Sequence, residues 1–421
     1  MDIHHGLGGG RRVEVVRADH SRIVVERGGH GYVQHPYMFR GHEYAHRTYY
    51  VNGRAYDRFY ARYPYHGVYV EMYTPAFYYP PAYYGWAYNP WAVPVAYPVA
   101  AWGWAAAPWY GYYGPYFAPY PVYASASFWL TDYLISTSLA AAYQARVNAA
   151  AAAQAQAQAD GAVPLTPQVK DLIAAEVQNQ IKIENAEAAQ QAQGPNPAIS
   201  GVQRMLSDNQ THVFVAGRDI DVVDAGGAEC ALTEGDVIQL TPTALPPDAT
   251  AATLVVLASK GGLECRKGVA VSVQIADLQD MQNHMRDVID QGMGDLKSKQ
   301  GTGGLPALPQ SASAAPAKAS FAAEAPPPDP DAANQITQQS QEADRAEKDV
   351  LAQAAPDSGG APAPAAAPGG KPAELTLGLT IDQVTSSLGQ PKRVADMGSK
   401  KIYFYDDMKV TFVDGKVTDI Q

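Results

Sequence analysis

Charged side chains are missing from the sixty residues between Met72 and Thr131. We call this stretch, which holds no Asp, Glu, Lys, Arg or His and is dominated by Tyr, Trp, Pro, Ala and Gly, the aromatic tract. Ten prolines interrupt it, so neither a long helix nor an internal strand is expected there. For the same reason the tract cannot form a membrane-spanning helix.

The rings of the aromatic tract are the candidate binding residues. Tyrosine and tryptophan combine an apolar face with a polar group, which suits partly hydrated surfaces such as lipid headgroups, sugar rings or other rings. We expect these rings to face outward and to bind such a surface, or each other, and the alternative is a low-complexity linker that packs on nothing in particular. The residues concerned are Tyr83, Tyr84, Trp86, Trp91, Trp102, Trp104, Trp109, Tyr112 and Tyr113.

Catalytic and cofactor motifs are also lacking. Gly8, Gly9 and Gly10 are not followed by the Lys and Ser or Thr of a phosphate-binding loop, and no GxSxG or HExxH occurs. Eight of the ten histidines fall in residues 1–66 at irregular spacing, as surface histidines do; we expect His212 on a strand edge and His284 on the polar side of a helix. The sequence therefore predicts a non-enzymatic protein with no catalytic, cofactor-binding or metal-binding residues.

Cysteine is scarce, with Cys230 and Cys265 alone in the chain. An even number within one folded segment favours a disulfide formed in an oxidising compartment. Two buried free thiols are the alternative.

Charge is divided unevenly along the chain. The net charge is -11, yet residues 1–66 carry ten Arg, no Lys and six acids, or +4. An acidic chain does not as a rule bind nucleic acid, so no nucleic-acid partner is expected. No apolar leader follows Met1. We expect the true start to lie upstream with a signal peptide, which would place the protein in the cell envelope, in the periplasm or at the outer membrane; without one it would be cytoplasmic.

Composition and hydrophobic pattern divide the chain into six segments. Turn signals such as Asn52-Gly53 lie between apolar-aromatic runs near the N-terminus, and five β-branched runs follow residue 200. The fold class expected is a multi-segment α+β protein. Its segments are a β-hairpin meander (1–74), the low-complexity part of the aromatic tract (75–124), a helical hairpin (125–195), a small β-barrel or sandwich with a C-terminal helix (200–300), a disordered Pro/Ala-rich linker (301–373) and an α+β module (374–421).

The last segment shows the most regular pattern. Thr380 and Gln383 form a capping box before an apolar helix, Gly389 and Pro391 end that helix, and three strands follow at 402–405, 408–413 and 417–420. This order, with its Leu388-Gly389-Gln390-Pro391 turn and the Asp414-Gly415-Lys416-Val417 hairpin, resembles the SmpA/OmlA small domain of the BamE-like family. The resemblance covers about 45 residues and implies a non-enzymatic α+β module that docks on a partner protein at the outer membrane.

These observations predict a cell-envelope protein that binds or scaffolds partners at the membrane or cell wall, with self-association as a further role of the rings. One alternative is a single-stranded nucleic-acid-binding protein, which would need arginines among the rings. Another is an enzyme with a site in the central β domain, which would need a concave cluster of polar groups with perturbed ionisation.

Overall fold

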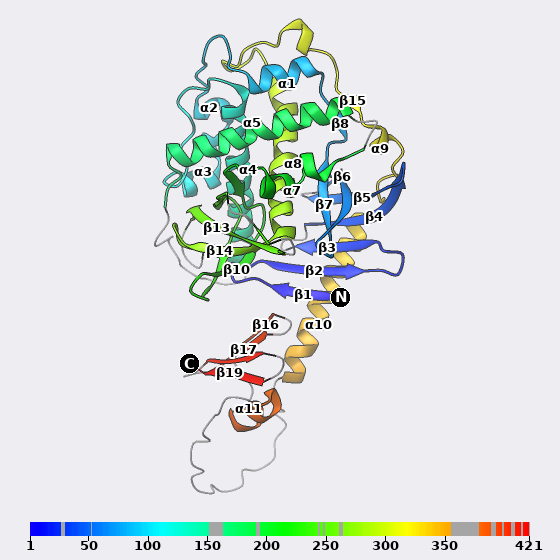
Figure 1. The fold of residues 1–421 in the computed structure, drawn as a ribbon, viewed down its shortest axis with the longest axis vertical. Helices are drawn as coiled ribbons and strands as arrows, with labels where there is room; N and C mark the ends of the chain where they lie inside the picture. Colours follow the sequence, from blue (N-terminus) through cyan, green and yellow to red (C-terminus); the bar gives the residue numbers. More distant parts are fainter. Residues whose placement is uncertain are drawn as a thin grey trace, which may run out of the picture. The chain divides into compact units, whose positions relative to one another are not determined.

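The computed structural model describes two compact units, Met1–Ala354 and Ala355–Gln421. The described residues are 1–26, 30–51, 53–150, 163–190, 194–242, 245–246, 249–260, 264–354, 379–388, 393–397, 400–405, 409–413 and 416–420. Both units mix helices with antiparallel sheets, so the α+β class is confirmed (Figure 1). No helix among the described residues is both long enough and apolar enough to cross a membrane.

A seven-stranded antiparallel meander opens the first unit, with its strands paired in sequence order. The two-residue loop between β5 and β6 places Gly53 at a φ of +79°, a conformation that glycine adopts without strain. The strands are β1 (Asp2–His5), β2 (Arg11–Val16), β3 (Arg22–Glu26), β4 (Gly31–Phe39), β5 (His42–Val51), β6 (Arg54–Tyr65) and β7 (Val68–Thr74).

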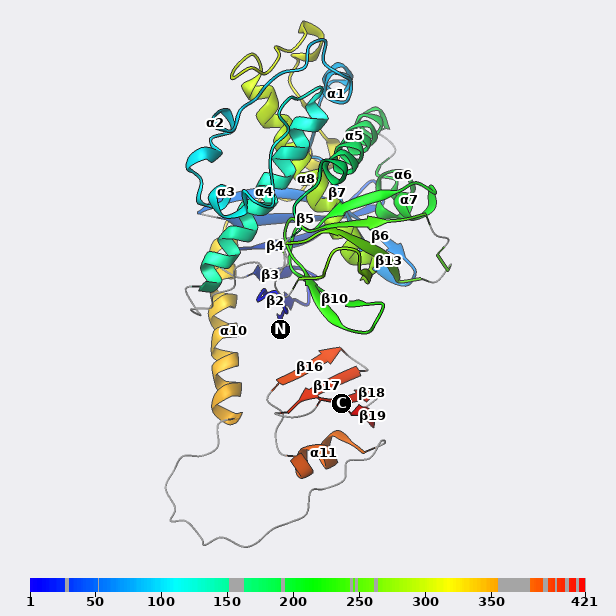
Figure 2. The same ribbon diagram turned by 90° about the vertical axis from the view of Figure 1, so that its left-hand side faces the viewer.

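The aromatic tract folds into short helices joined by irregular backbone: α1 (Pro81–Tyr88), α2 (Val99–Trp102), η1 (Trp104–Ala106) and α3 (Pro108–Tyr113). The long helices α4 (Ala126–Ala150) and α5 (Pro167–Gln190) follow and pack on the tract (Figure 2). Together with α8 they form the largest apolar cluster among the described residues, in which Trp129, Leu130 and Tyr123 are fully buried. The tract is therefore part of the core of this unit.

A six-stranded antiparallel sheet forms the central part of the first unit. Its strand order is β11-β10-β14-β13-β12-β9, a single open sheet where a barrel or sandwich was expected. Cys230 on β11 is bonded to Cys265, which is buried. The elements are α6 (Pro197–Ser200), α7 (Val202–Ser207), β9 (His212–Val215), β10 (Ile220–Asp224), β11 (Glu229–Leu232), β12 (Val237–Leu240), β13 (Ala251–Ala258), β14 (Ala270–Gln274) and α8 (Ile275–Lys299).

Helix α8 joins the parts of this unit. Its first turns pack Leu278 and Met281 on the six-stranded sheet, and its later turns pack Met293 and Leu296 on the aromatic tract. Gly292 permits the close approach of α4, because a Cβ there would lie 2.6 Å from Leu130 Cδ2.

The segment 301–354 is ordered and packed, so the prediction of a disordered linker is wrong for this part of 301–373. Phe321 of α9 (Ser320–Ala323) stacks on Tyr44, and Ile336 of α10 (Ala332–Ala354) lies buried against strands β2 to β4. The buried positions of α10, among them Ile336, were not recognised in the sequence because they lie within an Ala/Gln-rich segment. The other elements here are η3 (Gln310–Ala312) and β15 (Ala317–Lys318), which pairs with β8 (Phe77–Tyr78). Residues 355–373 lie outside the described residues.

The second unit contains α11 (Ile381–Leu388) and a four-stranded meander. The capping box at its start is present, since the Thr380 amide donates to Gln383 Oε1 at 2.9 Å. The structure has one strand more than the three predicted. This strand, Arg393–Met397, was not predicted because it lacks a run of β-branched residues. The strands are β16 (Arg393–Met397), β17 (Lys400–Phe404), β18 (Lys409–Val413) and β19 (Lys416–Ile420). The predicted turns at 389–391, 406–407 and 414–415 lie outside the described residues.

Candidate functional site: a carboxylate-lined pocket

The expectation that the tract's rings face outward is wrong. Tyr83, Tyr84, Trp91, Trp104 and Tyr113 are buried, Trp86, Trp102 and Trp109 are partly buried, and Tyr112 alone of the nine is exposed. The physical reason is that the rings pack on one another and on α4, α5 and α8, and several of them also find a polar partner inside the unit. Trp102, for example, stacks on Trp129 with ring centroids 4.5 Å apart and donates its indole N–H to the Tyr123 hydroxyl at 3.1 Å.

Polar partners reach the tract from residues that follow it in the chain. Asp132 Oδ2 on α4 accepts hydrogen bonds from the Tyr123 hydroxyl at 2.8 Å and from the Tyr120 amide at 2.6 Å. Its Oδ1 lies 2.7 Å from Nζ of Lys170 on α5, and that amine also donates to the Ala118 carbonyl. Burial raises the pKa of Asp132 and lowers that of Lys170. The tract itself has no charged side chain, so this buried ion pair provides its charged hydrogen-bond partners.

A pocket opens where β6, β7 and α8 meet. Its volume is about 180 Å³, and its charged and amide lining consists of Asp57, Arg58, Asp287, Asp290 and Gln291. The rest of the walls comes from aromatic side chains and from two small residues, namely Phe59, Tyr73, Phe77, Tyr79, Thr74 and Ala76. Three carboxyl groups face one guanidinium in a ring-lined cavity, so the lining favours positive charge in a ligand.

The helix is fixed against β7 by an amide side chain. Asn283 Oδ1 accepts the Tyr73 amide at 2.7 Å, and its Nδ2 donates to the Glu71 carbonyl at 2.6 Å. One turn further along α8, Asp287 forms an ion pair with Nε of Arg58. Burial raises the pKa of Asp287, and Arg58 acts against that rise. The spacing of 283, 287 and 290 places all three side chains on one helix face.

Asp290 is one of the three carboxyl groups that line the pocket. Its Oδ2 accepts the Tyr73 hydroxyl at 2.6 Å, and the carboxyl group of Glu184 is a second hydrogen-bond partner of Asp290. Burial raises the pKa of Asp290 to about 6, although hydrogen bonds from Tyr73 and Glu184 lower it. Asp290 therefore carries a negative charge at neutral pH.

A second carboxyl group lies behind Asp290. Glu184 on α5 is buried, accepts the Tyr84 hydroxyl at 2.7 Å and has its pKa raised well above the ordinary value, first by burial and then by the Asp290 charge. Two carboxyls this close share one proton, because both cannot ionise together. At neutral pH Glu184 holds the proton and Asp290 the charge.

The histidines of the folded part have defined partners. His212 lies at the start of edge strand β9, where Nδ1 contacts Glu176 at 2.8 Å. His284 does not face solvent as expected: its Nε2 lies 3.0 Å from the Ser138 hydroxyl, its ring covers Gly217, and burial lowers its pKa to about 4. No group of His, Cys, Asp and Glu that could hold a metal ion occurs among the described residues.

No protein-family model matches the chain, and neither a curated protein nor a solved structure matches it. The resemblance of 374–421 to the SmpA/OmlA small domain therefore stays a prediction.

Sequence reasoning missed the pocket because its lining comes from three separate places in the chain. A weak signal existed in α8. Asn283, Asp287 and Asp290 recur at intervals of four and three residues on a helix whose other face is apolar, which indicates a polar stripe against a partner. Nothing in the sequence showed that β6 and β7 would supply the opposite wall.

Proposed function

We propose that this protein is a non-enzymatic binding protein of the cell envelope, and that the pocket between β6, β7 and α8 binds a small organic cation. The observation that carries the proposal is the lining of the pocket, in which Asp57, Asp287 and Asp290 face a single guanidinium among aromatic rings. An ammonium group would pair with these carboxyl groups, Asp290 above all, while its carbon substituents contact the ring faces.

The size of the pocket limits the ligand. About 180 Å³ is less than the roughly 300–1,000 Å³ of sites that hold drug-sized molecules. The ligand class is therefore a primary or quaternary amine with few carbon atoms.

Calorimetric titration of the full chain with choline, ethanolamine and putrescine tests the pocket. We expect binding at pH 7.5, and we expect it to weaken as pH falls through 6, because Asp290 gains a proton. Asp290→Asn should abolish binding. Asp295→Asn is the matched control on the same helix, since Asp295 does not line the pocket and pairs with Lys299. Binding of none of these amines, or equal binding by Asp290→Asn, would contradict the proposal.

The envelope location is supported by the bond between Cys230 and Cys265, because such bonds persist in oxidising compartments. Fractionation of cells that produce the natural protein tests it. We expect the protein with the envelope and its thiols blocked; recovery in the cytosol with both thiols free would contradict this location.

The C-terminal unit supports a scaffolding role. It is a compact unit with its own core of Val384, Val410, Phe412 and Val417, as a docking domain needs. We expect the full chain to retain an envelope protein that a chain ending at Ala354 does not retain. Equal retention by both chains would remove this part of the proposal.

Acid–base catalysis is the second candidate function. The Glu184–Asp290 pair favours it, since carboxyl groups that share a proton are common in active sites. Binding is favoured over catalysis because Glu184 is not in the pocket lining, and no Ser, Cys or His lines the described pocket. Hydrolysis of an ester or amide of a bound amine, lost in both Glu184→Gln and Asp290→Asn, would favour the enzyme.

A further inference from the structure

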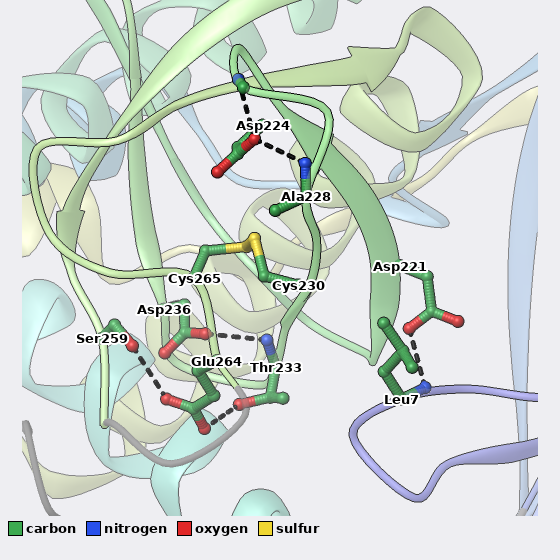
Figure 3. Close-up of a disulfide and its surroundings, with 11 residues drawn as sticks. Leu7, Asp221, Asp224, Ala228, Cys230, Thr233, Asp236, Ser259, Glu264 and Cys265 are labelled. Atoms are coloured by element: carbon green, nitrogen blue, oxygen red, sulfur yellow. Dashed lines mark hydrogen bonds between the residues drawn. A yellow bond between two sulfur atoms is a disulfide. The ribbon is translucent and has the colours of Figure 1, made fainter. Parts of the chain in front are cut away.

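A buried lysine lies beside two carboxyl groups near the disulfide. Lys260 follows β13, and its side chain is 5% exposed. Its Nζ lies 2.7 Å from Oδ1 of Asp236, which precedes β12 and is fully buried, and 3.3 Å from Oε1 of Glu264. Figure 3 shows Asp236 and Glu264 next to each other below the bond between Cys230 and Cys265.

Both carboxyl groups are held in place by other donors. Asp236 Oδ2 accepts the Thr233 amide at 2.8 Å. Glu264 accepts the Thr233 hydroxyl at 2.6 Å and the Ser259 hydroxyl at 3.0 Å (Figure 3). It also accepts the Lys260 amide at 2.6 Å. An amine and a carboxyl group are thus fixed in contact, with a third group within reach of the same nitrogen. Such preorganisation accelerates a reaction between two groups.

The surroundings of Lys260 exclude water. Tyr116 is buried beside it and donates its hydroxyl to the Gly235 carbonyl at 3.1 Å. Leu139 of α4 packs against Gly235, where a Cβ would lie 3.1 Å from Leu139 Cδ2. A dry site favours loss of water from the reacting groups and protects the product from hydrolysis.

Lys260 and Asp236 form an ion pair, so attack by the amine first needs transfer of one proton within the pair. Burial raises the pKa of Asp236 to about 7, and Lys260 acts against that rise. Burial lowers the pKa of Lys260, but Asp236 and Glu264 outweigh it and raise that pKa. Transfer of one proton from Lys260 to Asp236 keeps the total charge constant and gives a neutral amine and acid, the forms that burial prefers.

Two further acids face this group from the β9–β10 and β11–β12 connections. Asp219 and Glu234 have raised pKa values, about 8 for Glu234, with burial as the largest cause. They share a hydrogen bond, so one of them holds a proton. The ionised one interacts with Lys260 as a further negative charge.

We propose that Lys260 and Asp236 condense to an intramolecular isopeptide bond, with Glu264 as the proton carrier. The lone pair of Lys260 Nζ attacks Asp236 Cγ, forming the N–C bond. Glu264 takes a proton from the nitrogen and delivers it to the Asp236 hydroxyl, which leaves as water when the C–O bond breaks. The balance is amine plus carboxylic acid to amide plus water, with no change of oxidation state and no co-reactant.

The product would be a second covalent link beside the disulfide. It would join the start of β12 to the end of β13, while Cys230 and Cys265 join β11 to the residue after Glu264. Unlike the disulfide, an amide survives reducing conditions.

The mass of the intact full chain, measured after reduction and alkylation of the cysteines, tests the proposal. We expect a mass lower by one water than that of the sequence with two alkylated cysteines, and a branched peptide that joins Asp236 to Lys260 on digestion. Lys260→Arg and Asp236→Ala should have the full mass of their sequences. Glu264→Gln should keep the contacts of the site but lose the proton carrier, and should have mainly the full mass.

The pair of Lys170 and Asp132 is a matched control within the same molecule. It is equally buried and has the same 2.7 Å separation, but no other carboxylate lies within ion-pair distance of Lys170 among the described residues. Its peptides should be linear. The proposal is overturned if the folded wild-type chain has its full sequence mass and the Asp236 and Lys260 peptides are linear. That result does not depend on whether any variant folds.

Discussion

The aromatic tract and the C-terminal unit bury their apolar side chains in different ways. In the C-terminal unit the core comes from neighbouring strands and one helix, with Phe412 and Val410 two residues apart on β18. In the tract the rings sit on short helices and loops and meet side chains from distant elements, as Trp102 meets Trp129 and Tyr84 meets Glu184.

This difference shows when a core needs apolar residues at regular intervals along a strand. A small aliphatic side chain buries little area, so a core built from such residues needs a repeated pattern along each strand. A ring buries about 150–250 Å² and brings its own hydrogen-bonding group, so rings on irregular backbone can form a core without a repeat.

Removing one ring from the tract should have the largest effect. Trp129 is fully buried and stacks on Trp102 and Tyr133. Trp129→Ala should lower the free energy of unfolding of the first unit by about 3–5 kcal/mol, measured by urea denaturation. A loss below about 1 kcal/mol, as for an exposed ring, would contradict the claim that the rings of the tract form a core.

The corresponding change in the C-terminal unit is Phe412→Ala. Phe412 is fully buried in a small core, so its removal should cost about 3 kcal/mol and unfold this unit alone. Hydrogen exchange followed by mass spectrometry should show protection lost in 379–420 and kept in the tract. Loss of protection in both would contradict the division into two units.

Lowering the pH should remove the stabilising effect of Glu71, the charged residue that precedes the tract. Burial raises the pKa of Glu71, but Arg47 and Arg22 outweigh it and hold that pKa at about 2. A lowered pKa stabilises the folded chain above the unfolded value of about 4.5 by roughly 3 kcal/mol, and this contribution is lost as pH falls toward 2. We expect wild type to exceed Glu71→Gln by that amount at pH 6 and to match it near pH 2. A difference independent of pH would contradict this assignment.

The smallest effect concerns a single hydroxyl. Tyr84→Phe removes the hydrogen bond to buried Glu184 and the one from the Tyr79 amide, and should lower the free energy of unfolding by about 1–3 kcal/mol, measured by thermal unfolding. Tyr112→Phe is the control, since Tyr112 is exposed, and should stay within about 0.5 kcal/mol. Equal effects of the two substitutions would show that the buried polar partner does not matter.

The sequence predicted the elements that depend on local pattern. The meander of 1–74, the helices of 125–195 and the helix of the C-terminal unit follow from turn residues, caps and apolar repeats within a few positions. The packing of 301–354 and of the tract could not be predicted in this way, because Phe321 and Trp102 find their partners far away in the chain. The pocket depends on the same long-range packing, which brings Asp290 to Tyr73.

The most direct test of the buried tract is its tryptophan fluorescence. All six tryptophans lie between Trp86 and Trp129, and none of them is exposed, so the emission reports on the tract alone. We predict emission at shorter wavelength than in the urea-denatured chain, with little quenching by iodide. Emission at the wavelength of the denatured chain, with full quenching by iodide, would show that the rings face solvent and would contradict the account.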